Sequence, residues 1–120
     1  MRHCLVVDDS DVIRRVTKRI LEDFNMTSTE AESADEGMAL CQRAMPDLIL
    51  LDWHMPSMAP IDFISWVRSQ GGEQPYIFYC TTENDSEDLS QAFAAGADDF
   101  LMKPYDRDSL LRKLQGAGFT

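Results

Sequence analysis

Residues 48–52 read Leu-Ile-Leu-Leu-Asp, four consecutive aliphatic side chains followed by an acid. The run is too short for an ordinary helix, and its lack of polar alternation predicts a strand that is buried on both faces. Strands of that kind belong to parallel sheets that are covered by helices on both sides. The run therefore favours an α/β fold and places Asp52 at the carboxyl end of the most buried strand.

Four other short apolar segments flank this strand, and a helical pattern follows each strand-like segment. The four segments cover residues 4–8, 26–31, 76–80 and 99–102. Five strand-helix repeats in series predict a doubly wound parallel sheet of five strands with five helices, as a single domain over residues 1–120. Of the strand orders known for such sheets we adopt, without deriving it, the flavodoxin-like order 2-1-3-4-5.

Polar caps and apolar stripes set the expected starts and orientations of the helices. The expected N-terminal caps are Ser10, Ser33, Asp85 and Asp106. The stripes expected to face the core are Val12, Val16, Ile20 and Phe24 in the first helix, and Leu89, Ala92 and Phe93 in the fourth. The members of each stripe share one face at helical spacing, so all of them are predicted to be buried.

The chain is strongly acidic, with 21 Asp and Glu against 11 Lys and Arg and a formal net charge of −10. A nucleic-acid-binding surface needs an excess of basic residues, so we expect no nucleic-acid partner. No long apolar segment or secretory leader is visible, so we expect no membrane insertion and a cytoplasmic location. The three cysteines lack metal-binding spacing and fit reduced core residues in that compartment.

Polar residues gather where the predicted strands end. Asp8 and Asp9 close the first strand, Asp52 the third, Thr81 the fourth and Lys103 the fifth. The carboxyl ends of parallel strands share one edge of the sheet, which is where open α/β sheets bind ligands. Each residue alone has an ordinary explanation as a cap, a turn residue or a solvated lysine, but their common edge favours a site.

Carboxylates that lie close together repel one another, by about 4 kcal/mol for a pair ~4 Å apart at an effective dielectric constant of roughly 20. A shared proton, a lysine or a hard cation has to offset that repulsion, and carboxylate oxygens are ligands that suit Mg²⁺. A carboxylate can also act as a nucleophile and form an aspartyl-phosphate. We expect Asp52 to be this nucleophile, with a cation, Lys103 and the Thr81 hydroxyl each holding one phosphoryl oxygen.

Five short motifs, in order along the chain, are similar to those of response-regulator receiver domains. They are Val7-Asp8-Asp9-Ser10, Leu51-Asp52-Trp53-His54-Met55-Pro56, Thr81-Thr82-Glu83, Gly96-Ala97-Asp98 and Lys103-Pro104. Each motif alone has little specificity, whereas five in this order are highly specific and span essentially the whole chain. The chain resembles the stand-alone chemotaxis-type (CheY-like) regulators, which implies that no output domain is attached.

The resemblance implies a role for each residue of the site. Asp52 would accept the phosphoryl group, while Thr81 and Lys103 would contact it. Magnesium, for which Mn²⁺ or Ca²⁺ can substitute, would be held by Asp9, Asp52, the backbone carbonyl of His54 and, through water, Asp8. The residues beside the site that would tune its chemistry are Trp53, His54, Thr82 and Glu83.

The resemblance also implies partners and a switch. A sensor histidine kinase or a phosphotransfer protein would donate the phosphoryl group, and the chain would catalyse its own phosphorylation and dephosphorylation without being an enzyme for other substrates. Thr81 would move toward the phosphate while Phe100 turns inward. That change would remodel the face formed by the fourth helix, the fifth strand and the fifth helix, where a downstream protein target binds. The Lys103–Pro104 peptide bond is expected to be cis.

Two positions depart from the pattern of the family. Ala59-Pro60 stands where receiver domains usually carry Asp-Gly, and proline excludes the unusual dihedral angles that glycine permits, so the path of this loop is open. Phe100 lacks the hydroxyl of the tyrosine that chemotaxis proteins carry, so a hydrogen bond from that position to a partner is not expected.

Two other functions remain open. The first is a magnesium-dependent phosphohydrolase with an aspartyl-phosphate intermediate, but such enzymes usually carry a second acid where this chain has His54. The second is a docking module that signals without phosphate, which the intact acids, Thr81 and Lys103 argue against.

Overall fold

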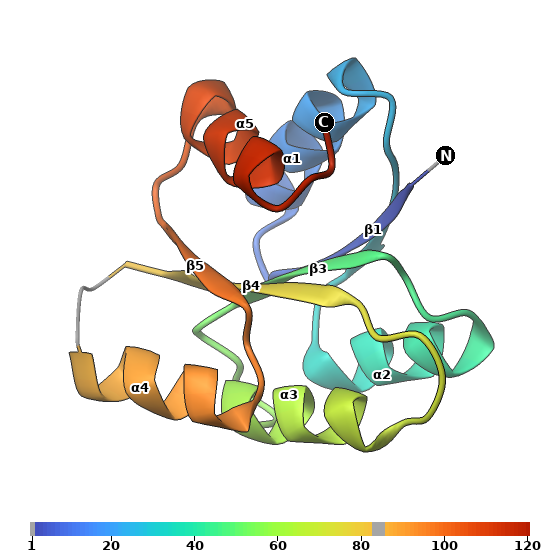
Figure 1. Ribbon diagram of the computed structural model, residues 1–120, viewed down its shortest axis with the longest axis vertical. Helices are drawn as coiled ribbons and strands as arrows, with labels where there is room; N and C mark the ends of the chain where they lie inside the picture. The colour runs from blue at the N-terminus through green and yellow to red at the C-terminus, as the bar shows by residue number, and fades with distance from the viewer. Residues whose placement is uncertain (1, 83–85) are drawn as a thin grey trace.

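The structure is a computed structural model that describes residues 2–82 and 86–120, in which strands and helices alternate (Figure 1). The strands are β1 (His3–Val7), β2 (Thr27–Ala31), β3 (Leu48–Asp52), β4 (Tyr76–Thr81) and β5 (Asp99–Met102). The helices are α1 (Asp11–Asp23), α2 (Ala34–Arg43), α3 (Pro60–Ser69), α4 (Ser86–Ala95) and α5 (Arg107–Gly116). The alternation predicted from the sequence is confirmed.

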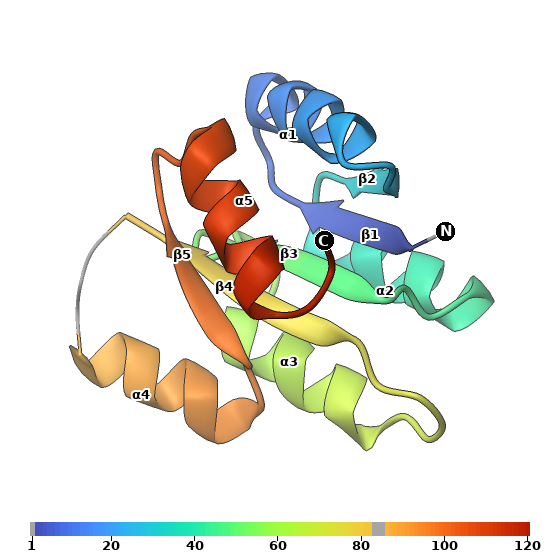
Figure 2. The ribbon, with the colours of Figure 1, turned by 45° about the horizontal axis from the view of Figure 1, so that its top comes forward.

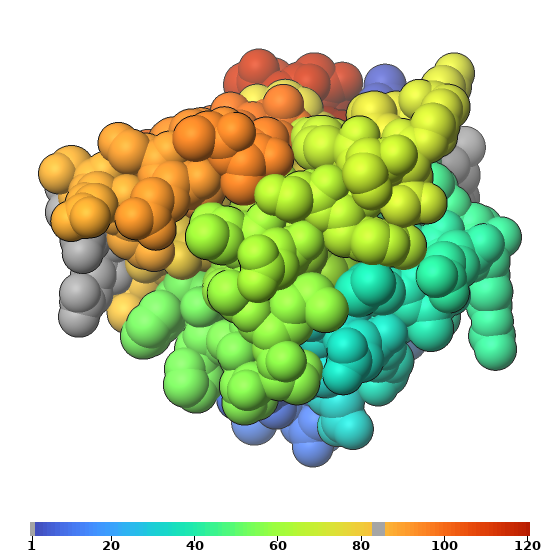
Figure 3. All heavy atoms as spheres, turned by 90° about the horizontal axis from the view of Figure 1, so that it is seen from below, coloured from blue at the N-terminus to red at the C-terminus, as the bar shows by residue number. Residues whose placement is uncertain are grey.

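The strands pair in parallel in the order β2-β1-β3-β4-β5, so the doubly wound, flavodoxin-like arrangement is confirmed. Helices α1 and α5 cover one face of the sheet, and α2, α3 and α4 cover the other (Figures 1 and 2). Seen from below, α2, α3 and α4 lie side by side as a continuous layer (Figure 3). This order makes β1 and β3 neighbours at the centre of the sheet, where their carboxyl ends can contribute to one site.

Strand β3 explains why both faces of the sheet need a helical cover. All five of its residues are buried. Ile49 and Leu51 belong to the apolar cluster under α2, α3 and α4, whereas Leu48 and Leu50 belong to the cluster under α1 and α5. Alternate side chains of one strand thus enter two separate cores, as expected for a continuous apolar run in a parallel sheet.

Helix α1 buries a face that differs in part from the predicted one. Ser10 caps it as predicted, accepting a hydrogen bond from the backbone N–H of Ile13 at 3.3 Å. Val12 and Val16, however, are 63% and 50% exposed, so their predicted burial is wrong. The buried residues of the helix are Arg14, Thr17, Ile20 and Leu21. The polar side chains of Arg14 and Thr17 can face inward because each finds a hydrogen-bond partner there.

Helix α4 also differs from the prediction at one position. Leu89 and Ala92 are buried as expected, but Phe93 is 42% exposed and does not belong to the core. This helix lies at the edge of its layer (Figure 2), so α3 covers only one of its flanks. The helix ends before Gly96, whose φ of +124° suits glycine. The predicted cap Asp85 lies outside the described residues.

Helices α2 and α5 start with the predicted capping residues. Ser33 accepts a hydrogen bond from the backbone N–H of Glu36, and Asp106 forms a reciprocal capping box with Ser109. Pro60 is the first residue of α3, a position at which the missing N–H of proline is tolerated. The departure at Ala59-Pro60 therefore changes how α3 begins and leaves the helix in place.

The cysteines agree with the expectation that they are core residues. Cys4, Cys41 and Cys80 are all buried free thiols. Burial raises the pKa of the Cys41 thiol to about 11, which keeps it protonated near neutral pH. None of the helices in the described part of the chain is long and apolar enough to cross a membrane.

Candidate functional site

Three acids meet at the carboxyl edge of the sheet. Asp8 directly follows β1 and Asp52 ends β3, and the register that pairs Val7 with Leu51 brings these two acids next to each other. Asp8 and Asp52 are only 4% and 3% exposed, whereas Asp9 is exposed to solvent. The acids therefore lie close together, as the sequence predicted, with two carboxylates buried and one exposed.

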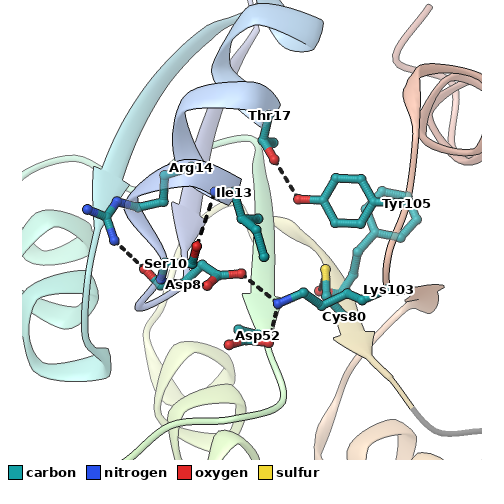
Figure 4. A network of polar contacts seen from close by, with 10 residues as sticks. Asp8, Ser10, Ile13, Arg14, Thr17, Asp52, Cys80, Lys103 and Tyr105 are labelled. Atoms are coloured by element: carbon teal, nitrogen blue, oxygen red, sulfur yellow. Dashed lines mark hydrogen bonds and ion pairs between the residues drawn. The ribbon is translucent and has the colours of Figure 1, made fainter.

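Lys103 joins the two buried acids. Its Nζ lies 2.9 Å from Asp8 Oδ2 and 3.0 Å from Asp52 Oδ1 (Figure 4). Lys103 follows β5, and its backbone N–H donates to the carbonyl of Thr81 at 2.7 Å, which fixes the lysine to the end of β4. The Lys103–Pro104 peptide bond is cis, as expected. The predicted juxtaposition of Lys103 with the acids is thus confirmed.

Burial and charge act in opposite directions on the titration of these groups. Desolvation raises the pKa of Asp52 and the nearby Asp8 raises it further, while hydrogen bonds from Lys103 and the backbone of His54 oppose the increase. For Lys103, desolvation lowers the pKa, but the hydrogen bonds with Asp8 and Asp52 outweigh it and the net pKa is raised. The lysine is thus held as an ammonium ion, and it contacts two of the three clustered carboxyl groups.

The donor set fits a hard divalent cation. One oxygen from each of Asp8, Asp9 and Asp52 can be chosen so that all three lie within 4.8 Å of one another. Oxygen-only ligation with an open side for water or phosphate is the arrangement that Mg²⁺ favours. Within residues 2–82 and 86–120, these three acids form the candidate cation site.

The predicted hydroxyl lies at the same edge. Thr81 is the last residue of β4 and is 2% exposed. Strand β4 pairs with β3, with Cys80 opposite Asp52, so Thr81 lies one residue beyond the level of the acid. The structure therefore brings Thr81 to the edge that carries Asp52 and Lys103.

Three of the residues predicted to tune the site, Trp53, His54 and Thr82, follow the carboxyl ends of β3 and β4. Trp53 and His54 are both exposed, and their rings lie 5.5 Å apart between centroids. The backbone N–H of Trp53 donates to the carbonyl of Cys80 at 2.8 Å, which ties the start of this loop to β4. Thr82 is exposed, and Glu83 lies outside the described residues.

Phe100 occupies β5 between the two helices of the predicted partner face. Its ring is half-buried against the cluster under α2, α3 and α4. Lys113 Nζ lies 4.3 Å above the ring centroid and also contacts Asp99 Oδ1 at 3.1 Å. A cation over an aromatic face is a favourable contact, so this conformation of Phe100 is held from the α5 side.

Sequence reasoning missed two supporting contacts of the site. Arg14 of α1 donates to the backbone carbonyl of Asp8 at 2.6 Å. The second is the Tyr105 hydroxyl, which lies 2.6 Å from the Thr17 hydroxyl, and burial raises the pKa of Tyr105. The sequence signal for both was the polar pair Arg14 and Thr17 at helical spacing in α1, which the more apolar valine stripe outweighed.

Residues 4–115 match the family model of the response regulator receiver domain. The match covers most of the chain, and the chain belongs to the receiver domains of two-component response regulators.

Individual relatives include chemotaxis proteins. The structure is similar to that of the chemotaxis response regulator CheY4 of Vibrio cholerae, with 34% identity, a TM-score of 0.91 and coverage of 97% of this chain and 98% of that chain. The chemotaxis protein CheY of Halobacterium salinarum is 30% identical over 110 residues, covering 92% of this chain and 91% of that protein.

Other relatives are longer proteins. The phosphate regulon transcriptional regulatory protein PhoB of Escherichia coli is 30% identical over 115 residues, which cover 95% of this chain and 50% of PhoB. The chain thus spans about half the length of the first curated relatives that it matches.

Proposed function

We propose that the chain is a phosphorylation-dependent switch in which the Asp52 carboxylate attacks phosphorus and forms an aspartyl-phosphate. The phosphoryl group comes from a phosphohistidine of a sensor histidine kinase or phosphotransfer protein, whose P–N bond breaks as the O–P bond to Asp52 forms. The observation that carries the proposal is the shared contact of Lys103 with Asp8 and Asp52 beside the exposed Asp9. That arrangement supplies a nucleophile, a fixed positive charge and a place for a cation.

A magnesium ion fits the acid cluster, with Mn²⁺ or Ca²⁺ as possible substitutes. Asp9, Asp52 and the backbone carbonyl of His54 would hold it, with Asp8 acting through water. When bound, such an ion neutralises part of the negative charge on the transferring phosphoryl group. The fit rests on the clustered carboxylate oxygens, which carry more negative charge than the single ammonium can offset.

Lys103 and Thr81 act on the phosphoryl group itself. The Lys103 ammonium already lies 3.0 Å from Asp52 Oδ1, so it is placed to stabilise charge on a group attached to this carboxylate. The Thr81 hydroxyl, at the end of the neighbouring strand, provides a neutral donor to another phosphoryl oxygen. Catalysis of this transfer is chiefly positioning and electrostatic stabilisation, which these two fixed groups supply.

The output is a change in the face formed by α4, β5 and α5. Movement of Thr81 toward the phosphate leaves room for Phe100 to turn inward, and the surface around it changes. Phe93 and Met102 are exposed apolar residues of α4 and β5, which suits a protein partner. The proposal is therefore a binding switch with self-catalysed phosphorylation and dephosphorylation and not an enzyme that turns over other phosphate esters.

Labelling with acetyl phosphate tests the proposal without requiring the natural donor. We expect the intact mass of the protein to increase by one phosphoryl group in the presence of Mg²⁺, and to stay unchanged after chelation or in Asp52→Asn. Trp53 adjoins Asp52, so binding of Mg²⁺ and phosphorylation should quench its fluorescence. Trp66 packs against Phe63, with 6.4 Å between the ring centroids, and should give a constant background. Trp53→Phe is the control that should remove the response.

Three results would contradict the proposal. A wild-type protein that gains no phosphoryl group at millimolar Mg²⁺ would remove its basis. Steady turnover of ordinary phosphate esters would favour the phosphohydrolase. A downstream partner captured equally by the Asp52→Asn protein and by wild type carrying the phosphate mimic beryllofluoride would favour the docking module that needs no phosphate.

A further inference from the structure

Arg14 is an inward-facing charged residue of α1 that the proposed chemistry does not use. It is 9% exposed, and its guanidinium has three acceptors. Nη1 donates to the backbone carbonyl of Asp8 at 2.6 Å (Figure 4), Nε donates to the Glu30 carboxylate at 3.2 Å, and Nη2 contacts the Asp11 carboxylate. A buried charge is tolerated only when it is paired and hydrogen-bonded, so these contacts hold the guanidinium in one position.

The carbonyl that Arg14 contacts belongs to the peptide group joining Asp8 to Asp9. A peptide group is planar, so fixing its oxygen fixes the direction in which the chain enters Asp9. Asp8 is also held at its backbone N–H, which donates to Ala31 at 3.0 Å, and at its side chain, which accepts from the backbone N–H of Ser10 at 2.9 Å. Arg14 therefore supplies the contact that orients the peptide leading to Asp9.

We propose that Arg14 is a positioning residue of the cation site. Arg14 keeps the Asp9 carboxylate within reach of the cation, which Asp8 and Asp52 approach from the buried side. The inference rests on the proposed function, because it concerns the cation used in that chemistry. Its physical basis is that three carboxylate oxygens within 4.8 Å can share one ion only while the backbone between Asp8 and Asp9 keeps its orientation.

The sign of the effect separates positioning from simple electrostatics. A positive charge near a cation site repels the cation, so electrostatics alone predicts that neutralising Arg14 tightens Mg²⁺ binding. Positioning predicts the opposite, because residues that orient metal ligands typically change metal affinity by roughly 10- to 100-fold when they are replaced. The direction of the change in dissociation constant is therefore decisive.

The experiment compares the Mg²⁺ dissociation constants of wild type, Arg14→Met, Arg14→Lys and Arg15→Met, from Trp53 fluorescence and from calorimetry. Arg15 is the next residue of the same helix and is exposed, so Arg15→Met is a control for the loss of charge. Arg14→Lys keeps the charge but lacks the planar fork that contacts several acceptors at once. We expect both Arg14 variants to bind Mg²⁺ roughly 10-fold or more weakly, and Arg15→Met to bind it equally or more tightly.

A further variant tests whether a loss of stability alone changes the Mg²⁺ affinity. Ile20→Val removes a methylene from the buried side of the same helix, so it should lower the unfolding midpoint and leave the dissociation constant unchanged. If Arg14→Met does not fold, Arg14→Lys alone decides the outcome, because its charge equals that of wild type. Wild-type Mg²⁺ affinity in Arg14→Lys would overturn the inference.

The inference and the proposed function fail in different ways. A wild-type protein that binds Mg²⁺ but accepts no phosphoryl group would overturn the proposed function, and the affinity comparison would still decide the role of Arg14. A wild-type protein that binds Mg²⁺ and is phosphorylated, with Arg14 variants of unchanged affinity, would overturn the inference alone. A wild-type protein with no affinity for Mg²⁺ would overturn both.

Discussion

The two edges of the sheet each hold a half-buried basic residue, but they balance its charge differently. At the carboxyl edge, the Lys103 ammonium faces Asp8 and Asp52, with Asp9 close by. At the amino edge, the Arg68 guanidinium donates to the carbonyls of Gly96 and Pro75, to Gln74 and to the Asp98 carboxylate.

This difference separates a candidate site from a structural contact. Arg68 pairs with one carboxylate and several neutral acceptors, so its charge is balanced and its hydrogen-bond donors are used. The carboxyl edge holds more acids than cations and can take up a further positive charge. Variants at each edge can test whether this charge balance determines which edge performs chemistry.

The largest effect is expected from Lys103→Met. Removing the only ammonium among the described contacts of Asp8 and Asp52 leaves two buried carboxylates unpaired, which should lower the free energy of unfolding in metal-free buffer by about 3 kcal/mol. Phosphorylation by acetyl phosphate should slow by roughly 10²-fold, because one stabilising donor is lost. Mg²⁺ should bind more tightly, since a competing cation is gone.

Urea denaturation with and without Mg²⁺, together with the time course of labelling, checks this prediction. Lys113→Met is the control, because Lys113 lies on α5 and its described contacts are with Asp99 and Phe100, not with Asp8 or Asp52. Unchanged stability of Lys103→Met in metal-free buffer would show that the acids at this edge do not repel one another as inferred.

The second effect is expected at the amino edge, from Arg68→Met. The carbonyl of Gly96 and the Asp98 carboxylate would lose their guanidinium donors, so we expect a loss of about 2 kcal/mol in the free energy of unfolding. The rate of labelling by acetyl phosphate should stay at the wild-type value. Arg43→Met, at an exposed position of α2, should change neither quantity. Slower labelling of Arg68→Met would contradict the division between the two edges.

Gly96→Ala is expected to have a smaller effect at the same edge. Gly96 has a φ of +124°, and a Cβ added there would lie 2.6 Å from Cγ of Arg68. We expect a loss of about 1–2 kcal/mol from backbone strain and crowding. Gly116→Ala is the control, because an added Cβ meets no atom within 4 Å there. Thermal denaturation should show a less than additive loss in Arg68→Ala/Gly96→Ala, since alanine lacks the Cγ that crowds the added Cβ; full additivity would exclude the contact.

The smallest effect concerns the stability of Asp52→Asn without metal. The pKa of Asp52 is raised above 3.8, so the folded protein holds this proton more tightly than the unfolded chain does. Wild-type stability should therefore fall as the pH rises from about 3.8 through the raised pKa, and the asparagine variant should avoid that loss. Urea denaturation in chelator across this range should show Asp52→Asn as the more stable protein at the upper end. If wild type were the more stable protein at the upper end of this range, the pKa of Asp52 would not be raised by folding as inferred.

The sequence predicted those features that depend on composition and order along the chain. The continuous apolar run in β3 predicted burial on both faces, and the polar residues at the strand ends predicted the site. Apolar spacing in α1 was a poorer guide, since it shows which residues share a face but not which face becomes covered. Thr17 faces inward because its partner Tyr105, 88 residues away, lies there. Contacts of that kind cannot be recognised from local periodicity.

Sequence reasoning was wrong about Phe93 and made no prediction for Arg14, and the reasons are related. Phe93 has the spacing of a core residue, but α4 lies at the edge of its layer and nothing in the described structure covers that side as a core would. Arg14 was not identified because a charged residue in an amphipathic helix is normally expected on the solvent side. Its acceptors, the Asp8 carbonyl and Glu30, come from the end of β1 and from β2 and become visible only after folding.

The wide spacing of the site along the chain has a consequence for synthesis in the cell. Lys103 is 95 residues from Asp8 and 51 from Asp52, so the ammonium reaches the acids only once the last strand has joined the sheet. A nascent chain on the ribosome whose β5 has not yet been made contains Asp8 and Asp52 but lacks Lys103. For the proposed phosphoryl transfer, the complete set of charged groups is therefore present only after β5 has joined the sheet.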